Sequence, residues 1–147
     1  MAAFKNCPEC GAVLTDGQTC EDYFHQMLYW EAEHPTYGEV HHLTVLCYHL
    51  QHPSLYSPDG LNEARRLLVE FVEWGTSPVE VRQRNRDYVD SGRRTWKIIA
   101  TATSRGSYNQ SVKWNMTAAD VVMDGPENYC DNVRAWAHSI NTTLQAL

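Results

Sequence analysis

Hydrophobic positions recur every three or four residues through most of the chain, which is the spacing of helices with one buried face. The first such segment should begin at Cys20, because Thr19 and Asp22 form a capping-box pair just before it. It should end before Pro35, which cannot continue a helix. Its apolar positions place Glu31 on the same face as Cys20, so this carboxylate is expected to point inward.

A second helix is predicted from about Tyr37 to His52, with Pro53 ending it. Thr36 with Glu39 has the spacing of another capping box at its start. The connection between these two helices is short, which favours antiparallel packing. The two helices are therefore expected to form a hairpin.

Later segments also carry signals for helix starts and an apolar face. Ser57 followed by Pro58 predicts a third helix ending at Gly75, and Ser77 begins a more polar one. The apolar face of the third helix is predicted to contain Leu61, Ala64, Leu67, Leu68, Phe71 and Trp74. Residues 91–115 show no clear period, and the β-branched run at 95–103 predicts a strand or an extended loop.

Near the C-terminal end, Thr117 with Asp120 predicts a short helix that ends near Gly125. The last helix should start around Pro126. Its buried side is predicted to contain Tyr129, Val133, Trp136, Ala137, Ile140 and Leu144. These segments predict a mainly α, single-domain chain over residues 1–147, with a zinc knuckle and turn at 1–20 and a helical bundle at 20–147.

Composition narrows the possible partners. Twelve basic and eighteen acidic residues give a net charge of -6, which disfavours nucleic acid and anionic membranes. The arginines that could form a local basic patch are Arg82, Arg84, Arg86, Arg93 and Arg94. A solvated helix face is the favoured interpretation of these arginines, and nucleic-acid binding is the alternative. The chain shows no membrane span and no secretory signal, so a cytoplasmic location is expected.

Three of the five cysteines lie within the first twenty residues, which indicates a metal site rather than disulfides. Cys7 and Cys10 form a C-x-x-C pair, and Gly11 lets the backbone bend so that amides point at the sulfurs. A redox pair is the other possibility, but it would call for a βαβ pattern. Cys20 fits as a third ligand, because the start of a helix stabilises a thiolate. Zinc is the expected metal.

The fourth ligand follows from the predicted hairpin, whose second helix ends beside the start of the first. His52 is the preferred candidate, with His49 and then His25 as alternatives, and a purely packing or capping role for His52 is also open. His41 is eleven positions from His52, or about 16 Å along a helix, so the two cannot share one ion.

Glu31 and His41 are expected to meet at the opposite end of the hairpin. A buried carboxylate needs a partner, and a satisfied Glu–His pair that fixes the hairpin is the favoured interpretation. The alternative is a catalytic acid–base site or second metal site, completed by His138 or Asp120. The paired Glu-x-x-His motifs of di-iron bundles are absent from the sequence.

The combined pattern resembles a family of small bacterial proteins of unknown function. The shared elements are the CPxCG knuckle and a helix of the form H-x-x-T-V-x-x-Y-x-x-Q-H-P, which here runs from His41 to Pro53. MTAADVV and VRAWAHSI are similar as well, so the resemblance spans the chain. The positions that it marks are Cys7, Cys10, Cys20, Glu31, His41 and His52. The chain departs from it at His42, where the family usually has Gln, and in the basic 82–94 region.

Two functions are consistent with these patterns. The first is a zinc-stabilised module that binds a protein or a small molecule, since a Cys₃His set leaves no open position for a substrate. The second is a metal-dependent enzyme with a polar site between helices at Glu31 and His41. The sequence identifies no substrate, partner or oligomeric state.

Overall fold

A computed structural model describes residues 5–15, 17–90 and 98–147. Within these ranges the chain forms six α-helices, two short 3-10 helices and a two-stranded hairpin, so the predicted mainly α fold is confirmed. Strands β1 (Lys5–Asn6) and β2 (Val13–Leu14) pair antiparallel on either side of the CPECG turn. This hairpin is too short to form a core of its own and packs against the helices.

Helix α1 (Cys20–Glu33) begins where the sequence predicted. The Asp22 amide donates to Thr19 Oγ1 at 3.3 Å, and the Thr19 amide donates to Asp22 Oδ2 at 2.8 Å, which completes the capping box. The side chains that α1 buries are Cys20, Tyr23, Met27 and Trp30. Cys20 is therefore held inward by the first turn of a well-capped helix.

The second helix is shorter than predicted. The chain first forms the 3-10 helix η1 (Pro35–Val40), and only then α2 (His41–Leu50). The predicted capping box of Thr36 is wrong, because neither η1 nor α2 has a side-chain cap. Glu39 is instead drawn to Arg134 of the last helix, at 2.7 Å between Glu39 Oε1 and Arg134 Nη2.

After α2, the short 3-10 helix η2 (Pro53–Leu55) leads into α3 (Pro58–Glu73), which Ser57 caps as predicted. Along α3 the buried positions include Leu61, Ala64 and Leu68. Trp74 was predicted on this apolar face but is 70% exposed, because it follows the last helical turn. Helix α4 (Pro78–Asp90) is the polar helix expected after Ser77.

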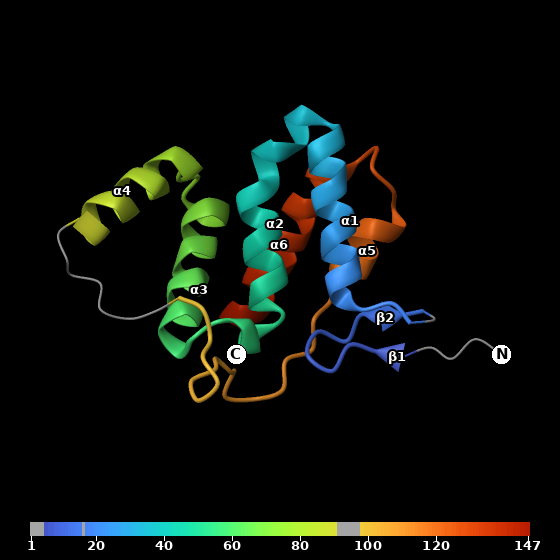
Figure 1. Cartoon of the computed structure of the whole chain (residues 1–147), viewed down its shortest axis with the longest axis horizontal. Helices are drawn as coiled ribbons and strands as arrows, with labels where there is room; N and C mark the ends of the chain where they lie inside the picture. The colour runs from blue at the N-terminus through green and yellow to red at the C-terminus, as the bar shows by residue number, and fades with distance from the viewer. Residues whose placement is uncertain (1–4, 16, 91–97) are drawn as a thin grey trace.

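The segment between α4 and α5 is irregular where it is described. Residues 91–97 of the predicted strand or loop lie outside the described residues. From Ile98 onward the chain makes isolated bridges, Tyr56 with Ile99 and Thr101 with Ser104, rather than a strand. This segment therefore runs as a loop along the base of the helices (Figure 1).

The last two helices match their predictions. Helix α5 (Ala118–Met123) carries the Thr117–Asp120 capping box, and Gly125 follows it with a φ of +82°. Helix α6 (Tyr129–Gln145) buries all six positions expected of it, and Tyr129, Val133, Trp136, Ala137 and Ile140 are fully inaccessible. Trp136 also donates its indole N–H to Gln51 at 3.2 Å, which ties α6 to the end of α2.

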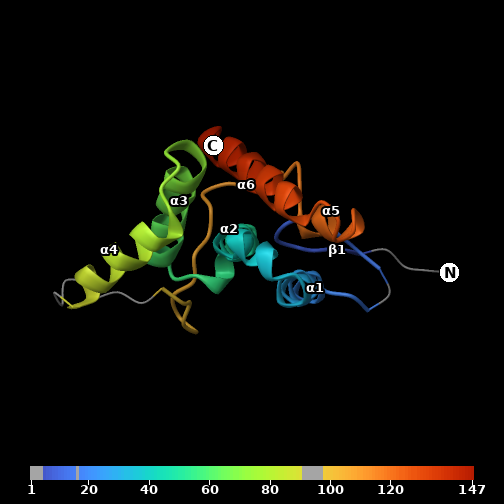
Figure 2. The same cartoon turned by 90° about the horizontal axis from the view of Figure 1, so that it is seen from above.

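Helices α1 and α2 stand side by side and antiparallel, with α6 crossing behind them (Figures 1 and 2). Helix α3 packs on α2 and α6, whereas α5 packs on α1 and α6. Helix α4 diverges from the far side of α3 and stands apart from the other helices (Figure 2). Among the described residues, none of the helices combines the length and apolar character needed to cross a membrane.

Candidate metal centre

Four potential metal ligands meet at the lower end of the α1–α2 hairpin. They are Cys7 and Cys10 of the knuckle, Cys20 at the start of α1 and His52 just after α2. Their ligand atoms all lie within 4.8 Å of one another. The structure thus brings together the four side chains that the sequence singled out, and they lie close enough to bind a metal ion.

The knuckle is shaped by its glycine. Gly11 has a φ of +79°, a left-handed backbone conformation that residues other than glycine adopt only with strain. In this conformation the Gly11 amide donates to the Cys7 carbonyl at 2.9 Å. The next amide, that of Ala12, points at the Cys10 sulfur at 3.4 Å. Both cysteines are consequently held on the inner side of the turn, and amide dipoles favour thiolate at Cys10.

His52 is oriented by a backbone carbonyl. Its Nδ1 lies 2.6 Å from the carbonyl oxygen of Tyr48, which can only accept, so Nδ1 carries the proton. The lone pair of Nε2 is left to face the Cys7 sulfur at 3.5 Å. The Tyr48 ring stacks on Phe24 with centroids 4.4 Å apart and packs on the His52 ring at the same distance. Histidines that bind zinc are commonly oriented by an N–H donated in this way.

The distances suit a tetrahedral ion. Thiolates bind zinc at ~2.3 Å, which puts two sulfurs of one tetrahedron roughly 3.7 Å apart. The Cys10 and Cys20 sulfurs are 3.4 Å apart, slightly less than this value. All four residues are buried, with at most 8% of their surface exposed. The donors therefore enclose a space for an ion, and their chemistry fits zinc.

The four groups of the cluster strongly affect one another's pKa values. The hydrogen bond from Cys20 lowers the pKa of the Cys10 thiol to about 4, while that contact and burial raise the pKa of Cys20 far above its usual value. Burial opposes a charge on His52, but hydrogen bonds with Cys10 and the Tyr48 carbonyl outweigh it and raise the pKa of His52 to about 9. A divalent cation would relieve this competition, because it stabilises all three thiolates and a neutral imidazole.

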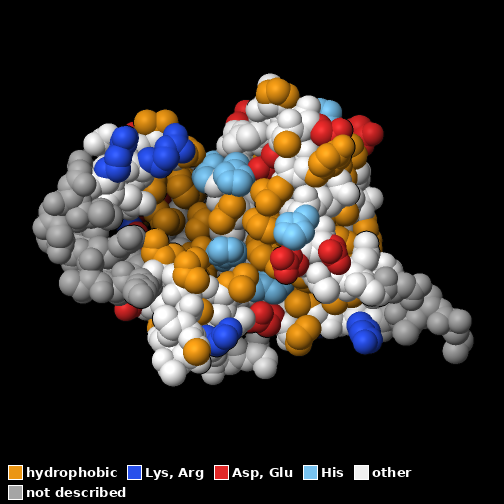
Figure 3. Space-filling model, in the orientation of Figure 1, with side chains coloured by type: hydrophobic (Ala, Val, Ile, Leu, Met, Phe, Trp, Pro, Cys, Tyr) orange, Lys and Arg blue, Asp and Glu red, His pale blue; other side chains and the backbone are white. Residues whose placement is uncertain are grey.

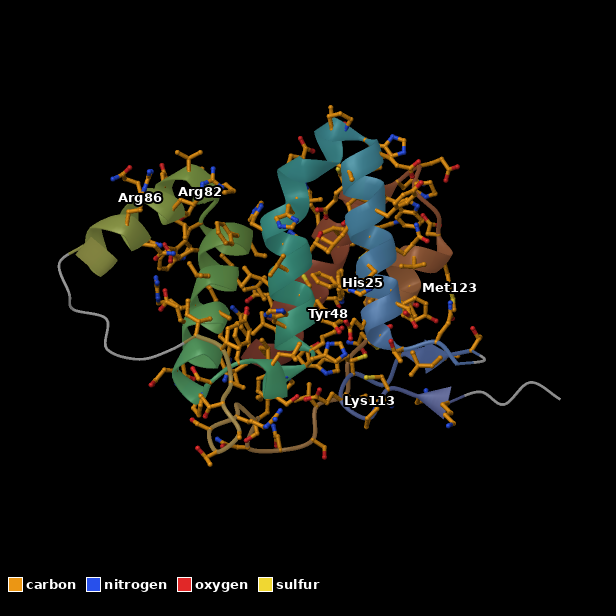
Figure 4. All side chains as sticks on the ribbon, in the orientation of Figure 1. His25, Tyr48, Arg82, Arg86, Lys113 and Met123 are labelled. Atoms are coloured by element: carbon orange, nitrogen blue, oxygen red, sulfur yellow. The ribbon has the colours of Figure 1, made fainter. Side chains whose placement is uncertain are left out.

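The two alternative histidines lie elsewhere. His25 is exposed on the outer side of α1 and pairs with Glu21 at 3.6 Å (Figure 4). His49 packs its ring edge-on against Tyr56, with centroids 4.9 Å apart, and its buried Nδ1 has no hydrogen-bond partner among the residues that the structure describes. Burial and the neighbouring His52 lower the pKa of His49. Of the three histidines considered, His52 is the one that reaches the sulfurs.

Glu31 and His41 meet at the opposite end of the hairpin, as expected. His41 Nδ1 lies 2.6 Å from Glu31 Oε1. The Glu31 side chain is only 8% exposed, whereas that of His41 is 54% exposed. The sequence did not anticipate the third member, Tyr129, which donates its hydroxyl hydrogen bond to Glu31 Oε2. Thr44 Oγ1 lies 2.9 Å from the Tyr129 oxygen and extends this network.

The other groups proposed for this second cluster are occupied elsewhere. Asp120 accepts the Thr117 amide at 2.8 Å, and His138 lines a groove on the far side of α2. Within residues 5–15, 17–90 and 98–147, potential ligands assemble into a metal-sized group at the Cys7, Cys10, Cys20 and His52 cluster alone. Each Glu31 oxygen has a hydrogen-bond partner, so the geometry is that of a satisfied buried carboxylate.

The fold and this cluster define a small helical protein with a Cys₃His centre at its N-terminal end. No curated protein and no solved structure was found to match the chain. A family model does match, over residues 5–145, and its description is "Family of unknown function (DUF5946)". The chain belongs to this family, whose function is unknown.

Proposed function

We propose that the chain binds one zinc ion through Cys7, Cys10, Cys20 and His52, and that this zinc is structural. The observation that carries the proposal is the closed donor set, in which four buried protein ligands converge within 4.8 Å. Catalytic zinc sites keep one position for water or substrate, whereas four protein donors fill a tetrahedral ion. The ion would join the knuckle to both helices of the α1–α2 hairpin.

With zinc in a structural role, we propose that the chain acts as an interaction module that binds a protein or a small molecule. The enzyme alternative, with Glu31 and His41 as catalytic groups, has less support from the geometry. Tyr129 and His41 occupy both oxygens of Glu31, and the described residues place no second set of metal ligands beside it. A zinc site built on three thiolates is consistent with a reducing compartment, and we propose the cytoplasm as the location.

Metal analysis of the purified protein tests the zinc proposal. We expect about one zinc per chain, and loss of most of it in Cys20→Ala, because three donors remain around an enlarged space. Cys130→Ala is the matched control, since Cys130 is a half-buried cysteine of α6 outside the cluster. Undiminished zinc in Cys20→Ala, or equal loss in both variants, would contradict the ligand set. X-ray absorption at the zinc edge should show three sulfur neighbours and one nitrogen neighbour.

A further inference from the structure

A small groove lies between η1, α2, α3 and α6, away from the metal centre. Its apolar lining includes Leu43, Phe71, Val72 and Ala137, and it holds about 200 Å³. Figure 3 shows apolar side chains gathered in the hollow between α2 and α3, with histidines at its edge. Sites for drug-sized ligands usually have ~300–1,000 Å³. The groove is thus better suited to one or two side chains of a larger partner than to a whole small molecule.

The margin of the groove carries positive charge. His42 lies in its wall with its ring edge-on to Phe71, at 4.5 Å between centroids. Burial lowers the pKa of His42, and the positive charges of His41, Arg82 and Arg134 lower it further. The acid on this margin, Glu39, is already paired with Arg134. Because Glu39 and Arg134 offset each other, the positive charge that this margin can offer a partner comes from Arg82 of α4, which lies close enough to His42 to act on its pKa.

Two arginines of α4 extend this positive margin. Arg84 is not one of them, because it turns inward and forms a forked pair with the buried Glu70 at 2.8 and 2.9 Å. Arg82 and Arg86 are exposed, and Figure 4 shows Arg82 near the end of α4 that adjoins α3 and Arg86 farther along the helix. Among the described residues Arg82 has no charged partner, and Arg86 contacts only the neutral Gln83. Within the described part of the chain, neither guanidinium group is paired with a carboxylate, so both can meet those of a partner.

The corner between α3 and α4 adds exposed apolar surface beside these charges. Trp74 is 70% exposed and Val79 is 63% exposed, within six positions of each other. Helix α4 is held to α3 through the buried Val81 and the Arg84–Glu70 pair, and it stands away from α2 and α6 (Figure 2). Clustered exposed apolar groups with a charged border are typical of interaction sites.

We propose that this groove and the α4 arginines bind an acidic amphipathic helical segment of a partner protein. The inference rests on the proposed role as an interaction module and names its partner class. Apolar side chains of the segment would enter beside Phe71, and its carboxylates would face Arg82 and Arg86. Charge complementarity selects an acidic occupant over a basic one, because like charges on the margin would repel each other.

Fluorescence anisotropy with a labelled synthetic peptide of about four helical turns tests this proposal. In the acidic peptide, Leu occupies the positions of one helical face and Glu occupies all other positions. A second, basic peptide has Lys in place of every Glu. We expect the acidic peptide to bind the wild-type protein and the basic one not to bind. The double variant Arg82→Glu, Arg86→Glu should weaken binding about tenfold or more, and Phe71→Ala should weaken it too.

The matched control is Arg105→Glu, Lys113→Glu, which changes the net charge equally on exposed residues of the 98–117 segment. Figure 4 shows Lys113 at the base of the molecule, away from Arg82 and Arg86 on α4. Equal weakening in both double variants would overturn the proposal. So would failure of the acidic peptide to bind, equal binding of the basic peptide, or binding of anionic vesicles or single-stranded RNA in its place.

Zinc content measured on the same samples separates this inference from the proposed function. If the protein contains zinc but does not bind the acidic peptide, the groove proposal is refuted and the structural zinc proposal is unaffected. Protein that purifies without zinc refutes the zinc proposal, and the peptide assay still reports on the groove, whose lining includes none of the four metal-centre residues.

Discussion

Removing one hydroxyl group should measure how much the buried Glu31 carboxylate depends on its partners. In Tyr129→Phe the ring can still pack edge-on to Trp30 and stack on Tyr37, with centroids 5.9 and 5.3 Å away. What is lost is the hydrogen bond to Glu31 Oε2, in a side chain that is only 8% exposed, together with the 2.9 Å contact with Thr44 Oγ1. Hydrogen bonds to charged groups contribute ~1.5–3 kcal/mol, so we expect a loss of about 2 kcal/mol.

For a domain of this size that loss corresponds to a fall in Tm of about 4–8 °C. Urea unfolding at neutral pH, followed by circular dichroism, gives the free energy of unfolding, and zinc content should stay constant. Tyr29→Phe is the matched control, because Tyr29 lies on α1 and is 59% exposed. It should change stability by less than about 0.5 kcal/mol. If Tyr129→Phe behaved like this control, the view of Glu31 as a carboxylate stabilised by its hydrogen bonds would be refuted.

Two further substitutions probe packing and protonation. Gly60→Ala should lower the free energy of unfolding by about 1–3 kcal/mol despite the better helix propensity of alanine, because its Cβ would lie 2.3 Å from the Ile98 carbonyl oxygen. Gly38→Ala is the control, since a Cβ there has open space around it, and it should leave the free energy of unfolding nearly unchanged in the same assay. Because burial lowers the pKa of His49, the unfolded chain binds this proton more tightly, so stability should fall as pH drops below the unfolded value of about 6.5. His49→Phe should make that fall shallower in unfolding measured between about pH 8 and 5, and an unchanged slope would show that His49 does not contribute to it.

Local signals predicted local structure well. The capping boxes at Thr19 and Thr117 involve residues three positions apart, and both are present where the sequence placed them. His52 was selected over His41 by the antiparallel hairpin, which needs only a short connection and the helical rise per residue. The clustering of the four potential ligands could therefore be anticipated without knowledge of the rest of the fold.

Contacts between distant parts of the chain could not be predicted in this way. Glu39 was expected to cap the second helix, but Arg134, 95 positions later, draws it away. Tyr129 was expected on the buried side of α6, yet nothing in its periodicity indicated that its hydroxyl would reach Glu31, 98 positions earlier. Periodicity identifies which face of a helix is buried, but not which polar groups meet across the interface.

The two ends of the α1–α2 hairpin have different requirements during synthesis. Cys7, Cys10, Cys20 and His52 all precede α3 in the sequence, so these four potential ligands are made before α3 emerges from the ribosome. The opposite end waits for Tyr129, because Glu31 meets this hydroxyl only after α6 has been translated. In a domain that folds from its N-terminus onward, the contacts at the metal end of the hairpin can therefore form first, and the Glu31 contact at the other end can form last.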